Sequence, residues 1–316
     1  MSTPVVQGPR AEAIADRIVE NVSSVLHGKN EVVRLALTAI VARGHLLLED
    51  RPGVGKTTLA SALAASIGGE FRRIQFTSDL LPSDILGVNA WDATRSCFEF
   101  HPGPIFCQVL LADEINRTSP KTQSALLEAM SEGQVTLDEQ RRDLPSPFLV
   151  IATQNPTEHS GTHPLPDSQL DRFMLRTRMG YPERDDEVAL LLGAERGRVK
   201  ELKPVSSPDE LLELSAAAER VQLHEDLAAH AVEIVRATRN SEHFAVGSSP
   251  RAGLDLAHAA RASALLAGRD HVVPDDLRRL TVPVLAHRLA PRDGRVSDPR
   301  VEAQLRSLLE TLPAPD

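Results

Sequence analysis

The sequence predicts an α/β fold, in which a parallel sheet with helices on both faces is followed by a small domain of helices alone. Three observations lead to this prediction. Apolar runs and helical patterns alternate through the first part of the chain, as they do in α/β proteins. Most of these runs are continuously apolar, which is typical of strands covered on both faces of a sheet. Beyond residue 204 the helical patterns continue without another convincing strand.

Apolar runs mark the predicted strands of the first domain. They cover residues 45–48, 71–76, 109–112 and 148–152. A helical pattern follows the first run, since Leu59, Leu63 and Ile67 recur every four residues. Leu126 and Met130 show the same spacing after the run that ends at residue 112. Strands that alternate with helices in this way join by right-handed crossovers into one parallel sheet.

The length and the change of pattern predict a division of the chain. Its 316 residues suffice for two domains at about 150 residues each. Two helix starts after residue 204, at Pro208 and at Pro274, have proline in the first turn and acidic residues directly after it. We therefore predict an α/β core, a linker and a helical domain. Their predicted bounds are residues 1–184, 185–204 and 205–316.

Composition excludes several classes of protein. Hydrophobic residues make up 41% and charged residues 25% of the chain, which excludes disorder and collagen. A net charge of −9 and 3% aromatic residues argue against a nucleic-acid-binding protein, leaving only a local basic patch as a route to nucleic acid. Cys97 and Cys107 are too few for a disulfide framework, and histidines such as His258 and His287 are interpreted as scattered helix residues. Without a signal peptide or a membrane-spanning run, we expect a cytoplasmic protein.

Residues 50–58, which follow the first predicted strand, are a candidate phosphate loop. Gly53 and Gly55 allow backbone N–H groups to surround phosphate oxygens at the positive end of the next helix. Lys56 would reach the terminal phosphates, and the Thr57 hydroxyl would bind Mg²⁺. The alternative is an ordinary glycine turn, and Asp50 replaces the first glycine of the usual spacing. The predicted nucleotide contacts are Pro52, Gly53, Val54, Gly55, Lys56, Thr57 and Thr58.

The ends of two further predicted strands carry complementary polar groups. Asp113 fits the carboxylate that holds Mg²⁺, and Glu114 fits the base that orients the attacking water. Asn155 ends the third run, where its amide would contact the γ-phosphate or that water. An acidic pair after a strand is usually a solvated loop. Because ligands of open α/β sheets bind at the carboxyl ends of the strands, the combination instead favours a site for ATP or ADP.

Four stretches resemble the motifs of MoxR-type AAA+ ATPases, and the resemblance covers nearly the whole chain. In order, they match the second nucleotide motif, the first sensor, the segment that presents an arginine finger and the second sensor. They are residues 110–117, 152–156, 165–173 and 247–252. His163 and Asp167 depart from the family pattern, which has tyrosine and more often glutamate there. The resemblance implies an AAA+ P-loop core followed by a small all-α lid domain.

The resemblance also implies roles that residue chemistry leaves open. Asn155 matches the first sensor, Arg172 matches the finger given to a neighbouring subunit, and Arg251 matches the second sensor, which reaches the nucleotide. Arginines on helices are otherwise most often solvated surface charges. Gly28 lies near the place of a glycine that contacts adenine in AAA+ proteins, although a plain helix cap explains it nearly as well. These residues would complete an ATPase site that lies between subunits.

Two segments of the core resemble elements that face the pore or a bound client in related rings. The first, residues 80–106, resembles an insertion into the second helix of this branch. The second, residues 134–144, resembles a hairpin that precedes the first sensor. Residue chemistry alone describes both as surface loops. Two interpretations therefore stay open: the segments contact a client or the pore, as the resemblance implies, or they are ordinary surface loops.

The function implied by the resemblance is ATP hydrolysis with Mg²⁺ by a homo-oligomeric ring, expected to be a hexamer. Such rings are chaperone-like: they remodel, assemble or mature protein complexes together with a partner that has a von Willebrand factor A domain. The alternatives are a motor of the magnesium-chelatase type, a nucleic-acid-remodelling ATPase and a nucleotide-binding scaffold. Acidic charge weakens the nucleic-acid alternative, and the presence of Glu114 weakens the scaffold. No nucleic-acid partner and no membrane insertion are expected.

Overall fold

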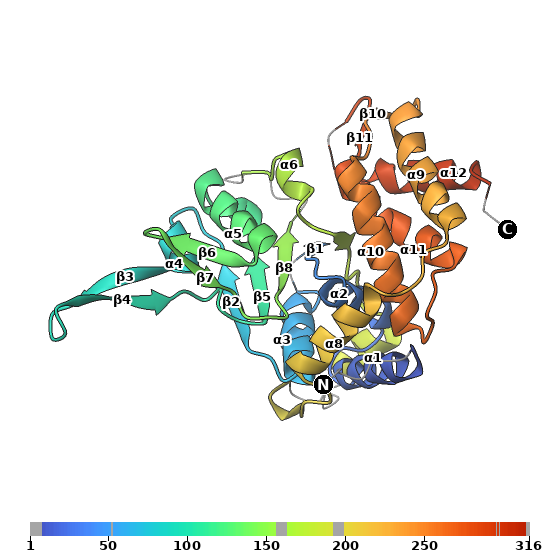
Figure 1. Cartoon of the computed structure of the whole chain (residues 1–316). Coiled ribbons are helices and arrows are strands. Elements are labelled where there is room, and N and C mark those ends of the chain that lie inside the picture. Colours follow the sequence, from blue (N-terminus) through green and yellow to red (C-terminus); the bar gives the residue numbers. More distant parts are fainter. Residues whose placement is uncertain are drawn as a thin grey trace.

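The core of the protein is one parallel sheet whose strands confirm the four predicted runs. A computed structural model describes residues 8–51, 53–155, 163–191, 199–294, 296 and 298–313. The sheet has five strands in the order β2-β5-β8-β1-β9 (Figure 1). They are β1 (Leu46–Glu49), β2 (Phe71–Gln75), β5 (Val109–Asp113), β8 (Leu149–Gln154) and β9 (Leu175–Thr177). The sequence analysis did not find β9, because three residues are too few to show a pattern.

Helices cover both faces of this sheet, as predicted. Alternate side chains of a strand point to opposite faces, so Leu46 and Leu48 join one hydrophobic cluster while Leu47 joins the other. The first face is covered by α1 (Gly8–Ser23), α2 (Asn30–Val41) and α3 (Lys56–Ser66). The second face is covered by α4 (Pro82–Leu86) and α5 (Pro120–Glu132). The strands of the sheet are therefore enclosed on both sides, which explains their continuously apolar sequences.

The C-terminal part of the chain is a bundle of helices with one small strand pair. The helices are α8 (Pro208–Ala218), α9 (Glu225–Asn240), α10 (Pro250–Leu266), α11 (Pro274–Leu285) and α12 (Arg300–Glu310). The Ser207 hydroxyl caps α8 by accepting a hydrogen bond from the Glu210 amide at 3.2 Å. β10 (Phe244–Val246) and β11 (Ala290–Pro291) pair antiparallel, which the sequence did not predict. These strands are too short to alternate visibly.

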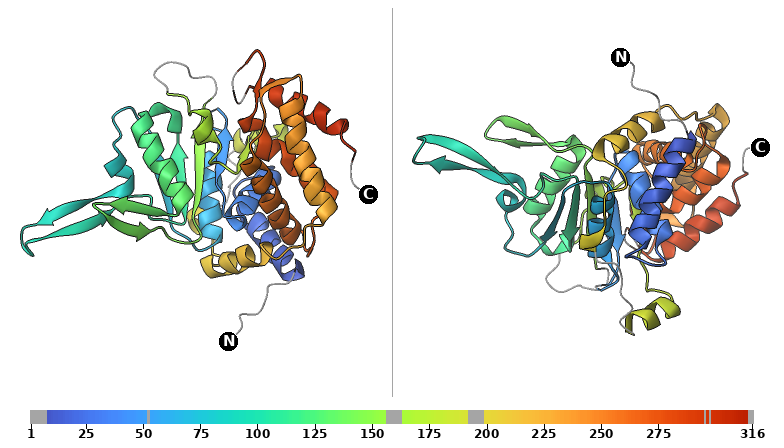
Figure 2. Two further views of the ribbon diagram at one scale, coloured as in Figure 1. Left: turned by 45° about the horizontal axis from the view of Figure 1, so that its top comes forward. Right: turned by 90° about the horizontal axis from the view of Figure 1, so that it is seen from below.

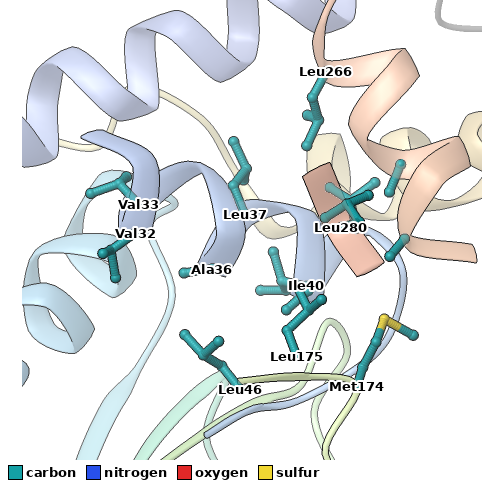
Figure 3. Packing of buried hydrophobic residues seen from close by; sticks show 14 of the residues in the cluster. Val32, Val33, Ala36, Leu37, Ile40, Leu46, Met174, Leu175, Leu266 and Leu280 are labelled. Atoms are coloured by element: carbon teal, nitrogen blue, oxygen red, sulfur yellow. The ribbon is translucent and has the colours of Figure 1, made fainter. Parts of the chain in front are cut away.

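The bundle and the sheet share one hydrophobic core across α2. Figure 3 shows apolar side chains of α2 lying between the strands of the sheet and the helices α10 and α11. Those that it labels are Val32, Val33, Ala36, Leu37 and Ile40 of α2, with Leu46, Met174 and Leu175 on one side and Leu266 and Leu280 on the other. Because α2 buries residues on nearly its whole circumference, it joins the two parts of the chain into one packed unit.

Two antiparallel hairpins extend from the second face of the sheet (Figures 1 and 2). β3 (Gly87–Asp92) pairs with β4 (Cys97–Pro102), within the predicted insertion. β6 (Gln134–Leu137) pairs with β7 (Gln140–Asp143), within the predicted hairpin. The guanidinium of Arg142 lies 3.8 Å from the Phe100 ring centroid, and the Asn89 amide donates to the Asp138 carboxylate at 2.6 Å. These contacts join the two hairpins side by side.

Short helical elements lie within the two parts of the chain and between them. They are η1 (Ile115–Arg117), α6 (Asp167–Leu170), α7 (Arg184–Leu191), η2 (Val199–Glu201) and η3 (Ala286–Arg288). α7 and η2 fall in or next to the predicted linker, and the domain boundaries at residues 184 and 204 stay predictions. Within the described ranges, none of the helices combines the length and the apolar composition that a membrane crossing requires.

Candidate nucleotide-binding site

Three neighbouring strands carry the candidate residues to one edge of the sheet. β1 and β5 both pair with β8 in parallel, so the carboxyl ends of all three strands meet there. The register is fixed past the strand ends, because the Asp50 amide donates to the Gln154 carbonyl at 3.1 Å. The phosphate loop, the pair Asp113 and Glu114, and Asn155 therefore follow adjacent strands. This is the edge at which open parallel sheets bind ligands.

The phosphate loop has a backbone that only glycine adopts without strain. Gly53 has a φ of +86° and Gly55 a φ of +98°, both in the left-handed region. A Cβ atom on Gly53 would meet nothing within 4 Å, whereas one on Gly55 would lie 3.0 Å from Leu26 Cδ1. The space beside Gly53 is thus open, whereas the Leu26 side chain occupies the space beside Gly55. Pro52, a predicted contact, lies outside the described residues.

The residues after the loop begin α3 and present the positive end of this helix. Gly55 is its N-cap residue, and Lys56, Thr57 and Thr58 form its first turn. Val54 is buried, while Thr57 is exposed and Thr58 is half-buried. The first backbone N–H groups of a helix have no partner within the helix and attract anions. An open glycine loop leading into such a turn fits the phosphates of a nucleotide.

Asp50 replaces the usual glycine and has a structural role. Its carboxylate accepts a hydrogen bond from the Gly180 amide at 2.8 Å, and its carbonyl accepts one from Lys56 Nζ at 3.0 Å. The neighbouring Arg51 donates to the Tyr181 hydroxyl at 3.1 Å. These contacts tie the phosphate loop to the chain that leaves β9. The departure from the glycine pattern therefore adds an anchor, which sequence spacing alone could not reveal.

The Asp113 carboxylate is fixed by donors from two neighbouring strands. Thr153 Oγ1 donates to Asp113 Oδ1 at 2.7 Å and itself accepts a hydrogen bond from the Glu114 amide at 2.9 Å. Arg73 Nη2 forms an ion pair with Asp113 Oδ2 at 2.6 Å, and the Arg73 side chain is 46% exposed. Sequence analysis assigned no role to Thr153 or Arg73, because their contacts cross between strands. The Asp113 side chain is itself only 13% exposed, so the half-exposed Arg73 is the partner that a cation would have to displace.

Glu114 has an unusual backbone conformation, and one oxygen of its carboxylate accepts two hydrogen bonds. Its φ of +58° lies in the left-handed region, which is strained for a residue other than glycine. This geometry brings its amide to Thr153. Glu114 Oε2 accepts hydrogen bonds from Gln75 Nε2 at 2.8 Å and from Arg117 Nη1 at 3.0 Å. Strain of this kind is typical of functional positions, and the carboxylate is placed beside Asp113 at the sheet edge.

The donor atoms at this edge fit Mg²⁺ as well as phosphate. The Thr57 hydroxyl and the Asp113 carboxylate are oxygen donors of the kind that Mg²⁺ prefers, and Mg²⁺ takes few protein ligands beside substrate phosphates and water. Asn155, 9% exposed, directly follows β8, the strand between those that lead to the loop and to the acidic pair. The predicted residues of the phosphate loop, the acidic pair and the first sensor therefore lie along one edge.

The two predicted arginines lie elsewhere in the chain. Arg172 Nη1 donates to the Leu127 carbonyl and to Ser131 Oγ, each at 2.7 Å, so its guanidinium lies at the end of α5. Arg251 is exposed in the first turn of α10. Among the residues that the structure describes, no hydrogen bond or ion pair joins either arginine to the phosphate loop. No contact among the described residues therefore supports a role for Arg172 at the nucleotide site of its own subunit.

Gly28 lies where α1 leads into α2, close to the chain that follows β9. It has a φ of +69°, and a Cβ atom there would lie 2.9 Å from the Asp186 carboxylate. The adjacent Lys29 donates to the Tyr181 carbonyl at 2.7 Å. Leu26, two residues before Gly28, contacts the position of Gly55. The glycine thus lies close to the phosphate loop, and its contact with adenine stays a prediction.

Comparison with known proteins defines the class of this fold. A family model for ATPases associated with various cellular activities (AAA) matches residues 45–175, which include the sheet edge. A second model, the AAA lid domain, matches residues 236–308 in the helical bundle. The parallel sheet with its helical lid is therefore that of an AAA+ ATPase.

Similarity over the whole chain defines the family. The chaperone MoxR1 of Mycobacterium tuberculosis is 39% identical, covering 95% of this chain and 82% of its own length. The Bacillus subtilis protein YeaC is 46% identical over 95% of this chain and 94% of its own. A crystal structure from Cytophaga hutchinsonii superposes with a TM-score of 0.86 at 32% identity, covering 98% of this chain and 97% of that one. The chain belongs to the MoxR family of AAA+ ATPases.

Proposed function

We propose that this protein hydrolyses ATP with Mg²⁺ as a ring of identical subunits and uses the energy to remodel or mature protein complexes. The observation that carries the proposal is the sheet edge itself. There the open glycine loop, the Asp113–Thr153 pair and the strained Glu114 follow three adjacent parallel strands. Membership of an ATPase family supports the same reaction. We place the ring in the cytoplasm, as the sequence suggests.

Each residue at the edge has a separate task in this reaction. The glycine loop, Lys56 and the first turn of α3 bind ATP by its phosphates. Thr57 and Asp113 would hold Mg²⁺, which would supply positive charge beside the terminal phosphates. Glu114 accepts the proton of the attacking water, and Asn155 orients that water or the γ-phosphate. Thr153 holds Asp113 in place and lets Glu114 adopt its strained backbone.

Assembly completes the site. The Arg172 guanidinium contacts Leu127 and Ser131 near the C-terminal end of α5, and among the described residues no hydrogen bond or ion pair joins it to the phosphate loop of its own subunit. We assign it to the site of the neighbouring subunit, where a finger arginine stabilises the charge of the transferring phosphoryl group. Arg251 would contact the nucleotide of its own subunit once the lid closes. We expect a hexamer.

The β3–β4 hairpin is the surface that we assign to a protein client. Trp91 and Phe98 are 57% and 70% exposed, and their rings pack edge to face with centroids 5.3 Å apart. Val88 is also exposed on this hairpin. Exposed apolar groups on a projecting element are typical of protein-contacting surfaces. A partner with a von Willebrand factor A domain remains our proposal for the factor that brings the client.

The reaction is tested by phosphate release from ATP and by equilibrium ATP binding. Lys56→Ala should weaken ATP binding at least tenfold, since it removes a charge-assisted contact with the phosphates. Lys200→Ala is the control, because Lys200 is an exposed lysine of η2, outside the phosphate loop. ATP affinity within threefold of the wild type in Lys56→Ala would contradict the assignment.

The client role is tested by capture in a hydrolysis-deficient ring. Glu114→Gln should bind ATP and retain its client, which is recovered from native cell extract and identified. A second substitution, Phe98→Ser, should abolish this recovery and leave ATP binding unchanged. Trp91, the one tryptophan of the chain, lies on the hairpin, so its fluorescence reports client contact directly. Recovery that survives Phe98→Ser would remove the hairpin from the client surface.

A further inference from the structure

One buried arginine of the lid holds the chain segment that carries Arg172. Arg288 belongs to η3, and its side chain is 3% exposed. Its Nε forms an ion pair with Asp171 Oδ1 at 2.9 Å, directly before Arg172 in the sequence. Its Nη2 donates to the Phe173 carbonyl at 3.0 Å, directly after Arg172. The guanidinium therefore binds the chain on both sides of the proposed finger.

The same guanidinium also binds the helix that begins with the proposed second sensor. Arg288 Nη2 pairs with Asp255 Oδ2 at 2.5 Å, and Asp255 lies one helical turn after Arg251 on α10. Burial raises the pKa of Asp255, and the charge of Arg288 opposes this effect. The planar guanidinium reaches Asp171 and Asp255 from separate nitrogens in a fixed geometry, whereas a lysine would present all its donors from one nitrogen on a flexible stem. Arg288 thus connects α10 of the lid to the segment of the core that bears Arg172.

A second contact next to Arg288 fixes the same segment. The fully buried His287 lies with Nε2 2.8 Å from the Phe173 carbonyl. Burial lowers the pKa of His287 well below its usual value, so the neutral ring donates Nε2–H to this carbonyl. The sequence suggested only a scattered helix residue here. Together the two adjacent side chains hold the backbone at Phe173 from the lid.

The segment held in this way continues to the phosphate loop of its own subunit. After β9, the Gly180 amide donates to the Asp50 carboxylate at 2.8 Å. Between these points Arg176, with a side chain 2% exposed, pairs with Glu49 at 2.9 Å and with Glu302 of α12 at 2.7 Å. The segment from residue 171 to residue 180 is therefore attached to the lid at residues 171, 173 and 176 and to the phosphate loop at residue 180. It links one nucleotide loop to the arginine offered to the next site.

We propose that Arg288 is a positioning residue for Arg172, tying the finger to the lid of its own subunit. This inference rests on the proposed action of Arg172 in the neighbouring site. Asp171 and Phe173 flank the finger, so a lid that moves must move the backbone on both sides of Arg172. A shift of about 1 Å in a catalytic group is enough to slow a reaction about a hundredfold. The lid of one subunit thereby controls the site of the next.

The variant that tests this proposal is Arg288→Lys, which keeps the charge but loses the bridge. Its ATP affinity should stay within threefold of the wild type, and its turnover should fall at least about tenfold. Arg300→Gln is the matched control. Arg300 also pairs with two aspartates, Asp293 and Asp298, but both belong to the lid and the arginine is half-exposed. Its turnover should equal that of the wild type.

Mixed rings separate positioning of Arg172 from a general effect on the fold. An Arg288→Lys subunit has an intact phosphate loop, and a Lys56→Ala neighbour supplies an Arg172 that is correctly held. Turnover per intact site should therefore rise at least threefold when the two variants are mixed. Unchanged turnover per site in verified mixed rings would overturn the proposal, because it would show that Arg288 acts only within its own subunit.

A milder variant decides the question if Arg288→Lys does not fold. Asp171→Asn removes one partner of Arg288 at a side chain that is 27% exposed. The buried Arg288 charge keeps its pair with Asp255, so the change leaves no buried charge without a partner. It should lower turnover at least threefold and be rescued in the same mixed rings. Wild-type turnover in Asp171→Asn, or loss without rescue, would overturn the proposal.

Arg172→Ala distinguishes this inference from the function on which it rests. If Arg172→Ala loses turnover and is rescued by Lys56→Ala while the Arg288 and Asp171 variants are not, only the positioning role is wrong. If Arg172→Ala hydrolyses ATP like the wild type, the finger assignment is wrong and the positioning role is overturned with it.

Discussion

The sheet edge and the junction between lid and core are both built from arginine–carboxylate pairs, but they differ in burial. At the edge, Arg73 and Arg117 are 46% and 49% exposed. At the junction, the side chains of Arg288 and Arg176 are 3% and 2% exposed. Exposed pairs are worth about 1 kcal/mol or less and exchange partners easily. Breaking a buried pair costs about 3–5 kcal/mol, because the remaining charge has no solvent.

This difference assigns the two regions different mechanical behaviour. Asp113 and Glu114 can release Arg73 and Arg117 when a nucleotide and a cation arrive, at little cost. The bridge from Asp255 through Arg288 to Asp171 should persist while the lid moves. We therefore expect the edge to change its partners during a reaction cycle and the junction to carry the resulting movement as one connected body.

The largest effect is expected for Arg172→Ala, because the junction holds the chain on both sides of Arg172 and we assign this arginine to the sheet edge of the neighbouring subunit. ATP binding should be normal, and turnover should fall about a thousandfold, the lower range for a finger arginine. Mixing with Lys56→Ala should restore activity, and wild-type specific activity should rise with protein concentration as rings assemble. Steady-state phosphate release measures all three effects. Absence of recovery in verified mixed rings would mean that Arg172 does not act on a neighbour.

A large part of the edge could be predicted from the sequence, since its signals are local. The runs that form β1, β5 and β8 are continuous, and the polar groups follow each of them directly. Lys56, Asp113 and Glu114 are thus placed by topology alone, because parallel strands end at a common edge. Confirmation of the strands and of the family supports this logic, while the chemical roles stay predictions.

The junction could not be predicted, because its contacts join distant positions. Arg288 lies 117 residues from Asp171 along the chain, and His287 lies 114 residues from Phe173. A single sequence contains no signal for such pairs. The same reason hides Thr153 and Gln75, whose partners lie on neighbouring strands. β9, β10 and β11 were missed because each has too few residues for a pattern.

The next effect concerns the base at the edge. Glu114→Gln should bind ATP like the wild type and turn it over about a hundred times more slowly, since amides do not accept the proton from water. The Gln75 and Arg117 contacts can still reach the amide oxygen, so the local structure should persist. Glu128→Gln on the exposed face of α5 is the matched control. If Glu114→Gln turns over ATP at the wild-type rate, another group is the base.

The smallest effect is on stability, and it compares a buried histidine of the core with one of the junction. Burial lowers the pKa of His45 to about 4, against about 6.5 in an unfolded chain. The ring is held neutral: Nδ1 accepts a hydrogen bond from the Val150 amide, while Nε2 lies 3.1 Å from the Met130 carbonyl. His287 in the junction is buried with the same direction of shift. Because the folded chain disfavours the protonated form of both rings, protonation of either histidine stabilises the unfolded chain.

The sign of the pH dependence follows from proton binding. Between pH 6.5 and pH 4 the unfolded chain binds a proton at His45 that the folded chain excludes, so the free energy of unfolding falls as the pH falls. At pH 5 the loss from His45 should be about 2 kcal/mol relative to pH 7. His45→Gln keeps a donor and an acceptor but cannot titrate, so urea denaturation at several pH values should show this loss removed. His287→Gln should likewise reduce the loss of unfolding free energy on acidification. If both buried variants lost as much as the wild type, the fold would not hinder protonation of either histidine.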